Sequence, residues 1–217
     1  MTSSSNGGFL FDFDGVISHS ERHTNPAISD VLAQRGFSWQ PVPIEIYGGW
    51  TWQAISQDVC RRVSGLSETD LGAELAASFE KRVLRSPVLV PGADMALKLA
   101  SRRGPTGIAT GSDRPVVLQF LKHFQLTPYV QHIVSAELYS EPKPSPMCFE
   151  MLAHGLQVQP SASTVFEDSL AGVTAGSASG AQVIAIHHEV TLSAAVRARC
   201  HRAVPDFRVL ISEGFFG

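Results

Sequence analysis

The sequence predicts an α/β protein with a parallel sheet, helices on both faces and one inserted all-helical segment. Apolar runs that resemble buried strands alternate with segments able to form helices, and this alternation is typical of a parallel sheet. The expected strands are Phe9–Phe13, Thr106–Thr110, His132–Ser135, Thr164–Phe166 and Val183–Ile186. The expected helices near the later strands are Ala93–Arg103, Pro115–Phe124, Pro146–Gly155, Leu170–Ser179 and Leu192–Arg199.

The stretch between the first two expected strands breaks the alternation. It has no convincing strand but several helix candidates, which are Ala27–Arg35, Trp52–Val63 and Leu71–Leu84. A crossover between parallel strands needs only about a dozen residues, so the excess predicts a separate helical module. We therefore expect residues 1–17 and 88–217 to form the core and residues 18–87 to form the helical insertion.

Composition points to an ordinary globular protein of 217 residues, with 44% hydrophobic and 17% charged residues and a mean hydropathy of +0.06. The net charge of -3 provides no basic field for nucleic acid. No apolar run approaches the roughly 20 residues of a membrane-spanning helix. The polar leader Met1–Gly8 does not resemble a signal peptide. Cys60, Cys148 and Cys200 are scattered and odd in number, which favours reduced thiols and a cytoplasmic location.

The most informative segment is Phe9–Ile17, where Asp12 and Asp14 follow an apolar run. Residues two apart on a strand face the same side, and ligands bind at this edge of parallel sheets. Gly15 permits a sharp turn there. Two adjacent carboxylates repel each other, so a divalent cation is the simplest remedy. The alternative is a strand end whose two solvated aspartates cap a turn.

Polar side chains also follow the later expected strands. Thr110 and Gly111 offer a hydroxyl and an unobstructed N–H group ahead of a helix, a combination that suits an anion but is also common in turns. Lys143 stands between two prolines, which stiffen its loop, although a lone loop lysine is usually solvated. Glu167 and Asp168 end another strand, where Asp168 or Ser169 could simply cap the next helix.

Together these segments resemble the four signature motifs of the haloacid dehalogenase-like superfamily, in its subfamily with a helical cap. The resemblance covers nearly the whole chain and rests on Asp12-Phe-Asp14-Gly-Val, Thr110, Lys143, and Glu167-Asp168 with the trailing Gly172. Relatives in this subfamily include phosphoglycolate-type phosphatases, β-phosphoglucomutase and sugar-phosphate phosphatases. The resemblance implies a Rossmann-like core and a mobile helical cap.

The resemblance also implies a role for each motif residue. Asp12 would be the nucleophile that forms an aspartyl-phosphate. Asp14 would be the general acid and then the base that activates water. Thr110, with the N–H groups of Gly111 and Asp14, would hold the phosphoryl oxygens, and Lys143 would neutralise charge on nucleophile and phosphoryl group.

A magnesium ion is the cofactor that the resemblance implies. Its ligands would be Asp12, Asp168 and the carbonyl oxygen of Asp14, with Glu167 bound directly or through water. A charge count agrees, because four carboxylates would face one cation, Lys143. Like charges 4 Å apart repel by about 4 kcal/mol at an effective dielectric constant of ~20. Oxygen ligands and phosphate chemistry favour Mg²⁺ over a softer metal.

Departures from relatives separate the possible chemistries. Haloacid dehalogenases lack the second acidic residue of the first motif, and phosphonate-cleaving relatives replace it, whereas this chain keeps Asp14. β-Phosphoglucomutase carries a cap-loop arginine and a lysine after the second motif. Here tryptophan stands in the corresponding stretch Gly48–Trp52, and Asp113 replaces the lysine. These losses favour hydrolysis, although Arg114 could partly compensate in a mutase.

Substrate selection is expected to lie in the cap. His19 stands near a position that is acidic in many relatives, and Trp50 or Trp52 could offer an apolar platform for a sugar or base. Each of these has a plain alternative: a solvated hinge histidine, or tryptophans in the cap's own core. We also expect Ser112 and Arg114 to contact the substrate.

The sequence therefore predicts a cytoplasmic Mg²⁺-dependent phosphatase of a small phosphorylated metabolite, such as a sugar or polyol phosphate. It would act as a monomer or weak homodimer and bind neither nucleic acid nor membrane. A phosphomutase is the enzymatic alternative, and a non-catalytic protein that binds a ligand or partner is the alternative of another class. The C-terminal Phe215-Phe216 pair is expected either to pack on the core or to form a dimer contact.

Overall fold

The computed structural model describes residues 7–43, 46–47, 50–188 and 193–217. The chain divides into two compact units, one formed by Met1–His19 with Leu89–Gly217 and the other by Ser20–Val88. Most of the predicted polar leader, residues 1–6, lies outside the described residues, and so does the Gly48-Gly49 turn. Each unit has its own fold.

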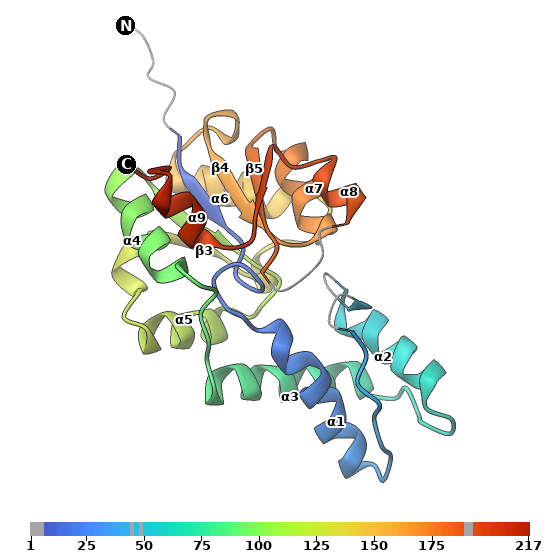
Figure 1. Cartoon of the computed structure of the whole chain (residues 1–217). Helices are drawn as coiled ribbons and strands as arrows, with labels where there is room; N and C mark the ends of the chain where they lie inside the picture. The colour runs from blue at the N-terminus through green and yellow to red at the C-terminus, as the bar shows by residue number, and fades with distance from the viewer. Residues whose placement is uncertain (1–6, 44–45, 48–49, 189–192) are drawn as a thin grey trace, which may run out of the picture. The chain divides into compact units, whose positions relative to one another are not determined.

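The first unit contains a six-stranded, fully parallel sheet (Figure 1). Its strands are β1 (Phe9–Phe11), β2 (Thr106–Ala109), β3 (His132–Val134), β4 (Thr164–Glu167), β5 (Gln182–Ile186) and β6 (Arg202–Val204), in the spatial order β3-β2-β1-β4-β5-β6. Phe11 lies level with Ile108 of β2 and Phe166 of β4. The strand order therefore reverses at β1, and the carboxyl end of such a central strand is where ligands bind in open α/β sheets.

Helices cover both faces of this sheet, which confirms the predicted fold class. One face carries α6 (Met147–Leu156) and α7 (Leu170–Ala178), which contact β1–β3 and β4–β5 respectively. On the other side α4 (Ala93–Arg103) contacts β2 and α9 (Phe207–Ser212). The remaining helices are α5 (Arg114–His123), α8 (Ala194–Arg197) and the short 3₁₀ turns Thr127–Tyr129, Ala136–Leu138 and Pro160–Ala162.

Side-chain alternation along the strands divides the core between the two faces. Leu10 and Val165 belong to the cluster formed with α6 and α7. Phe11 and Phe166 point the other way, with ring centroids 4.5 Å apart, and both pack against Phe207 of α9. Consecutive residues of β1 thus serve opposite layers, so the register of this strand fixes the orientation of the residues that follow it.

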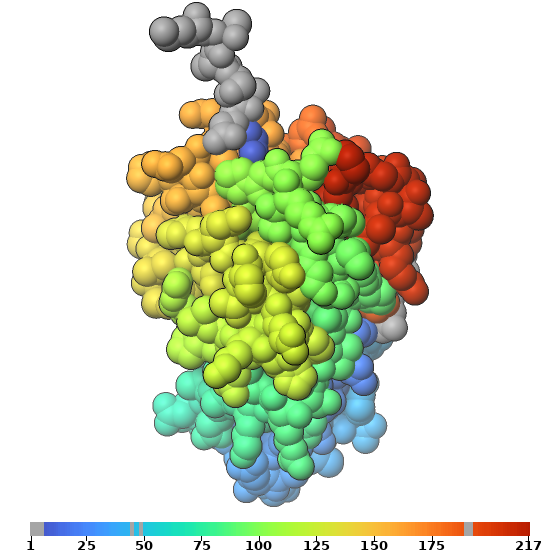
Figure 2. Space-filling view, turned by 90° about the vertical axis from the view of Figure 1, so that its left-hand side faces the viewer, coloured from blue at the N-terminus to red at the C-terminus, as the bar shows by residue number. Residues whose placement is uncertain are grey.

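The C-terminal segment packs onto the core. Phe216 is only 4% exposed and its ring lies 5.8 Å from that of Phe9 and 5.9 Å from that of Phe166. The Phe207 N–H donates to the carbonyl oxygen of Pro91, just before α4. Figure 2 shows the red C-terminal segment beside the green helix α4. Of the two expectations for the final aromatic pair, packing on the core is therefore the one observed.

Among the strands and α-helices of the described residues, β6 and α9 are not predicted from the sequence. The strand β6 spans only Arg202–Val204 and is half-exposed, so it shows neither a clear apolar run nor alternation. The side chain of Asp206 caps α9 by accepting from the Arg208 N–H at 2.8 Å, a signal that the sequence does contain. The predicted first strand was also too long, because β1 ends at Phe11. The predicted Leu192 start of α8 lies outside the described residues.

The second unit is helical and has its own apolar core. It contains the 3₁₀ turn Glu21–His23, α1 (Thr24–Gln34), α2 (Trp52–Arg62) and α3 (Leu71–Arg85). Leu32, Ile55, Val59 and Leu75 are buried between these helices. The Thr51 side chain caps α2 by accepting from the Ala54 N–H. Among the described residues, no helix has both the length and the apolar character that crossing a membrane requires.

The buried Phe216 generates a stability prediction. Replacement by Ala should lower the free energy of unfolding by roughly 3 kcal/mol, because a large ring would be removed from an aromatic cluster. Denaturant unfolding of Phe216→Ala measures this loss. Leu138→Ala is the control, since Leu138 is 47% exposed and should change stability by less than about 0.5 kcal/mol. Equal, small changes for both variants would show that the C-terminus contributes little to the fold.

Candidate functional site

A tight turn after β1 places Asp14. The N–H groups of Ile17 and Ser18 both donate to the carbonyl oxygen of Phe13, at 2.9 and 2.8 Å. Gly15 has φ +76°, a left-handed conformation that favours glycine. A Cβ atom at Gly15 would also overlap the Asp168 carboxylate. Glycine is therefore required there both by the turn and by the approach of Asp168, which follows β4.

Lys143 is the buried cation of the site. Its Nζ donates to Oδ1 of Asp12, to Oε1 of Glu167 at 2.6 Å and to the carbonyl oxygen of Ala109 at 3.3 Å. The ammonium also lies 4.9 Å from the centroid of the Phe149 ring. Burial opposes its charge, but the carboxylates of Asp12 and Glu167 outweigh burial and raise the pKa of Lys143 well above its usual range. Lys143 therefore stays protonated between two acids from adjacent strands.

Glu167 is held by donors at both carboxylate oxygens. Oε1 accepts from Lys143, and Oε2 accepts from the N–H of Asp168 at 2.9 Å and from the N–H and hydroxyl of Ser169 at 3.1 Å. Of the two expected caps, Ser169 is the one observed at α7, since its Oγ accepts from the Gly172 N–H. A Cβ at Gly172 would overlap the Glu167 carboxylate, which explains the glycine at this position of the helix.

The carboxylates of Asp12, Glu167 and Asp168 gather at one point. One oxygen from each lies within 4.8 Å of the others. Burial raises the pKa of Asp12 well above its usual range; Lys143 partly offsets this, while Glu167 and Asp14 add to it. One lysine therefore does not compensate the acids, and Asp12 needs a proton or a further cation. Closely spaced hard oxygen donors fit a Mg²⁺ ion in that place.

The Asp14 side chain faces a second set of polar residues, Thr110 and Ser112, which follow β2. Its Oδ2 accepts from the Ser112 hydroxyl at 2.5 Å and lies 3.5 Å from the Thr110 hydroxyl. The Thr110 Oγ1 in turn accepts from the Ser112 N–H at 2.9 Å. A Cβ on Gly111 would lie 4.0 Å from the Tyr139 hydroxyl, so the corner above Gly111 is open. The structure thus brings Asp14, Thr110 and Ser112 together beside an accessible backbone.

Tyr139 and Cys148 are neighbours of the site that the sequence did not reveal, because neither belongs to a recognisable motif. The Tyr139 hydroxyl donates to the carbonyl oxygen of Thr110 at 3.0 Å. Burial raises the pKa of Tyr139 to about 12 and that of Cys148 to about 11. Both therefore remain protonated at neutral pH, so Tyr139 is a fixed donor that anchors the loop carrying Thr110.

The residues expected to contact the substrate are distributed over both units. In the first unit, the His19 ring packs edge-on against His188, with centroids 4.7 Å apart, and Arg114 donates to the carbonyl oxygen of Ile133 at 3.0 Å. In the helical unit, Trp50 is 44% exposed, whereas the Trp52 ring lies 5.0 Å from Phe79 and packs against the unit's apolar core. Trp52 therefore has a packing role within its own unit.

Comparison with known proteins identifies the family. The profile of the haloacid dehalogenase-like hydrolase family matches residues 9–186. The chain belongs to this family. It is therefore an enzyme of the hydrolase class, as predicted from the sequence.

Two curated relatives, both from Escherichia coli K12, are phosphatases. Fructose-1-phosphate phosphatase YqaB is 28% identical over 82% of this chain and 94% of its own length. Hexitol phosphatase A is 32% identical over 83% of this chain and 82% of its own length. A crystal structure of a conserved haloacid dehalogenase-like protein of unknown function from Agrobacterium tumefaciens has a TM-score of 0.79 at 24% identity, covering 96% of this chain and 97% of that one. This last likeness shows the shared fold.

The packing of Gly172 against Glu167 generates a second prediction. Gly172→Ala should displace the Glu167 carboxylate and leave buried donors unsatisfied, at a cost of about 1–3 kcal/mol in unfolding free energy. Ser177→Ala on the same helix is the control, because Ser177 is exposed and the substitution should change stability by less than about 0.5 kcal/mol. Thermal and denaturant unfolding measure both. A Gly172→Ala protein as stable as wild type would mean that Glu167 can relax without loss.

Proposed function

We propose that this enzyme is a phosphatase that hydrolyses a small phosphorylated metabolite, a sugar or polyol phosphate, through an aspartyl-phosphate on Asp12. The observation that carries the proposal is the paired arrangement of Asp12 and Asp14. Asp12 is held by Lys143 beside Glu167, and Asp14 is held by Ser112. Two carboxylates in different surroundings suit two different roles, a nucleophile and a proton carrier. The substrates named for YqaB and hexitol phosphatase A support the substrate class.

Asp12 is the proposed nucleophile. The Lys143 ammonium fixes one of its oxygens and leaves the other to attack phosphorus, and the same cation neutralises charge on the phosphoryl group. The bond between phosphorus and the leaving alcohol oxygen of the substrate breaks as the bond between an Asp12 oxygen and phosphorus forms. Water then attacks the phosphorus of the aspartyl-phosphate, which releases inorganic phosphate and restores the carboxylate.

Asp14 is the proposed general acid and base. It would deliver a proton to the leaving oxygen in the first step and accept one from water in the second. The Ser112 hydroxyl, 2.5 Å from Oδ2, directs that carboxylate. Thr110 and the N–H of Gly111 would hold the phosphoryl oxygens, and Tyr139 would keep their loop in place.

Mg²⁺ is the proposed cofactor, held by Asp12, Asp168 and the carbonyl oxygen of Asp14, with Glu167 as a direct or water-mediated ligand. When bound, it supplies positive charge that neutralises the carboxylates and the phosphoryl oxygens. The raised pKa of Asp12 is consistent with this need, because the carboxylate has to be ionised to act as a nucleophile.

Substrate choice is assigned to the helical segment 18–87, which we propose acts as a cap. Trp50 is the best candidate for an aromatic platform, because its ring is exposed while Trp52 packs within the unit. His19 remains a proposed substrate contact. Arg114, the residue that could have supported a mutase, donates to a backbone carbonyl, which favours hydrolysis over phosphoryl transfer between sugars. The three unpaired cysteines accord with the predicted cytoplasmic location.

Asp12→Asn tests the nucleophile. The shape is nearly unchanged, but an amide cannot form the acyl phosphate, so phosphate release should fall by about 10⁴-fold or more. Removing the divalent cation with EDTA should also abolish phosphate release by the wild type, and added Mg²⁺ should restore this activity. Asp113→Asn, at an exposed carboxylate beside the site, is the matched control and should stay active. Substantial activity of a pure Asp12→Asn protein would rule out the covalent route.

Asp14→Asn tests the proton carrier. Alkyl phosphates need a protonated leaving group and should react about 10²–10⁴-fold more slowly, whereas an activated aryl phosphate should lose much less in the phosphoryl-transfer step. Two rates are compared: the release of aryl alcohol from the aryl phosphate in a single turnover, and the steady-state hydrolysis of a hexose phosphate. Ser112→Ala should show a weaker loss with the same substrate preference. Equal losses on both substrates would instead indicate a metal-binding or structural role for Asp14.

Trp50→Ala tests substrate selection. Loss of an aromatic platform should raise KM for a hexose or polyol phosphate by roughly 3- to 10-fold and leave hydrolysis of a small aryl phosphate nearly intact. Trp52→Ala is the comparison: it should lower the melting temperature and affect both substrates alike, since its ring packs against Phe79. If Trp50→Ala leaves KM unchanged for every sugar and polyol phosphate, the platform lies elsewhere.

A further inference from the structure

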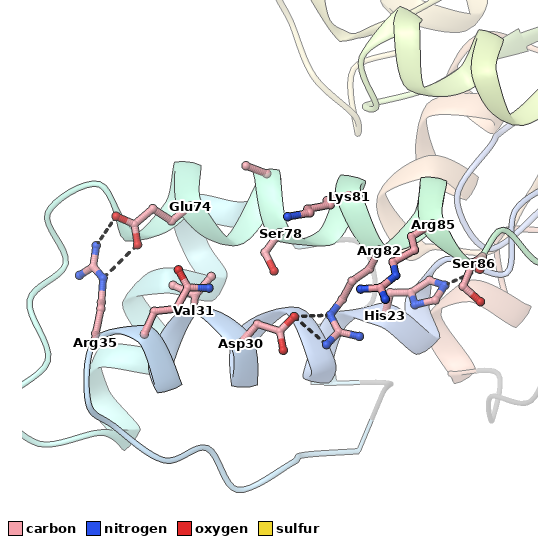
Figure 3. A pocket seen from close by; sticks show the side chains of 12 residues that line it. His23, Asp30, Val31, Arg35, Glu74, Ser78, Lys81, Arg82, Arg85 and Ser86 are labelled. Carbon is pink, nitrogen blue, oxygen red and sulfur yellow. Dashed lines mark hydrogen bonds and ion pairs between the residues drawn. The ribbon is translucent and has the colours of Figure 1, made fainter.

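The helical unit contains a hollow of about 870 Å³ between α1 and α3 (Figure 3). The two helices run antiparallel, because Arg35 at the end of α1 pairs with Glu74 near the start of α3, while Asp30 pairs with Arg82 near its end. The volume falls in the range of small-ligand sites. The hollow shares no residue with the carboxylate cluster of the sheet.

The charges that line the hollow do not cancel. The carboxylates of Asp30 and Glu74 are each taken up by an arginine. Lys81 and Arg85 line the same hollow, and neither belongs to an ion pair found within the described part of the chain. The hollow therefore carries two uncompensated positive charges, although the whole protein has a net charge of -3.

The positive charge is concentrated at one end. Figure 3 shows Arg82, Arg85 and His23 gathered there, below Lys81. Burial lowers the pKa of His23, as do the nearby Arg22 and Arg82, while the hydrogen bond to the Ser86 carbonyl oxygen at 3.2 Å partly opposes this shift, so the neutral form of the ring is favoured.

Helix dipoles do not account for this concentration. The dipoles of the antiparallel helices oppose one another at this end, so the side chains decide its sign. Lys81 and Arg85 are one turn apart on α3, where like charges repel unless an anion lies between them.

We propose that this basic end binds the phosphate group of a small anion, either inorganic phosphate or a phosphorylated metabolite. A phosphate monoester carries nearly two negative charges at neutral pH, which matches the two uncompensated cations. The Arg85 guanidinium can bind two phosphate oxygens side by side, and Lys81 adds a point charge. Nucleic acid would require a longer basic stripe than these few residues form.

Isothermal titration calorimetry in the presence of EDTA tests the proposal. The ligands are inorganic pyrophosphate, inorganic phosphate and a hexose phosphate. Without a divalent cation the carboxylate cluster repels anions, so the hollow is the expected binding site. Lys81→Gln/Arg85→Gln should weaken binding about tenfold. The control Arg102→Gln/Lys122→Gln removes the same charge from exposed positions in the last turns of α4 and α5, and should bind like the wild type.

The outcomes separate clearly. Binding that is lost only in the Lys81/Arg85 variant supports the site, and comparison of the three ligands tells free phosphate from a phosphorylated metabolite. The proposal is overturned if none of the three ligands binds at about 10 mM, because a site with a weaker affinity than this would hold its ligand only marginally. An equal loss in both double variants also overturns it, because general electrostatic attraction would then explain the heat. Neither result depends on catalysis.

Discussion

The buried ammonium of Lys143 is the interaction on which the candidate site depends. It joins Asp12, after β1, to Glu167, at the end of β4, and it also reaches the backbone of β2 at Ala109. Removing one partner of such a buried pair leaves an uncompensated charge, which is costly in an apolar interior. The raised pKa of Asp12 shows that even with Lys143 in place the acids are not fully compensated. A structure with this imbalance is suited to bind a further cation and an anionic substrate together.

The rest of the site follows from the sheet register and from two glycines. Because β1 lies between β2 and β4 with Phe11 level with Ile108 and Phe166, the residues after all three strands meet at one edge. Side chains larger than hydrogen at Gly15 or Gly172 would occupy the space of the Asp168 or Glu167 carboxylates. Glu167 at the end of β4 and Asp168 directly after it thus keep their positions partly because the two glycines have no side chain.

The strand ends and their polar residues could be predicted from the sequence because burial and chemistry leave local marks: apolar runs followed by acids, a Thr-Gly pair or a lysine. The strand β6 left no such mark, and the ring partner of Trp52, Phe79, is distant in sequence. The hydrogen bond from Tyr139 to the backbone of Thr110 also joins distant segments. Contacts of this kind are set by tertiary packing, which a single sequence does not reveal.

The stereochemical course at phosphorus tests the covalent route through Asp12 most directly. Each in-line displacement inverts the configuration at phosphorus, so transfer to Asp12 followed by transfer to water predicts overall retention. The substrate would be a hexose phosphate made chiral at phosphorus with sulfur and oxygen isotopes. Its hydrolysis in isotopically labelled water would show which course is followed. Retention agrees with an aspartyl-phosphate. Inversion would mean that water attacks the substrate directly and that the carboxylates serve only to bind cations and move protons.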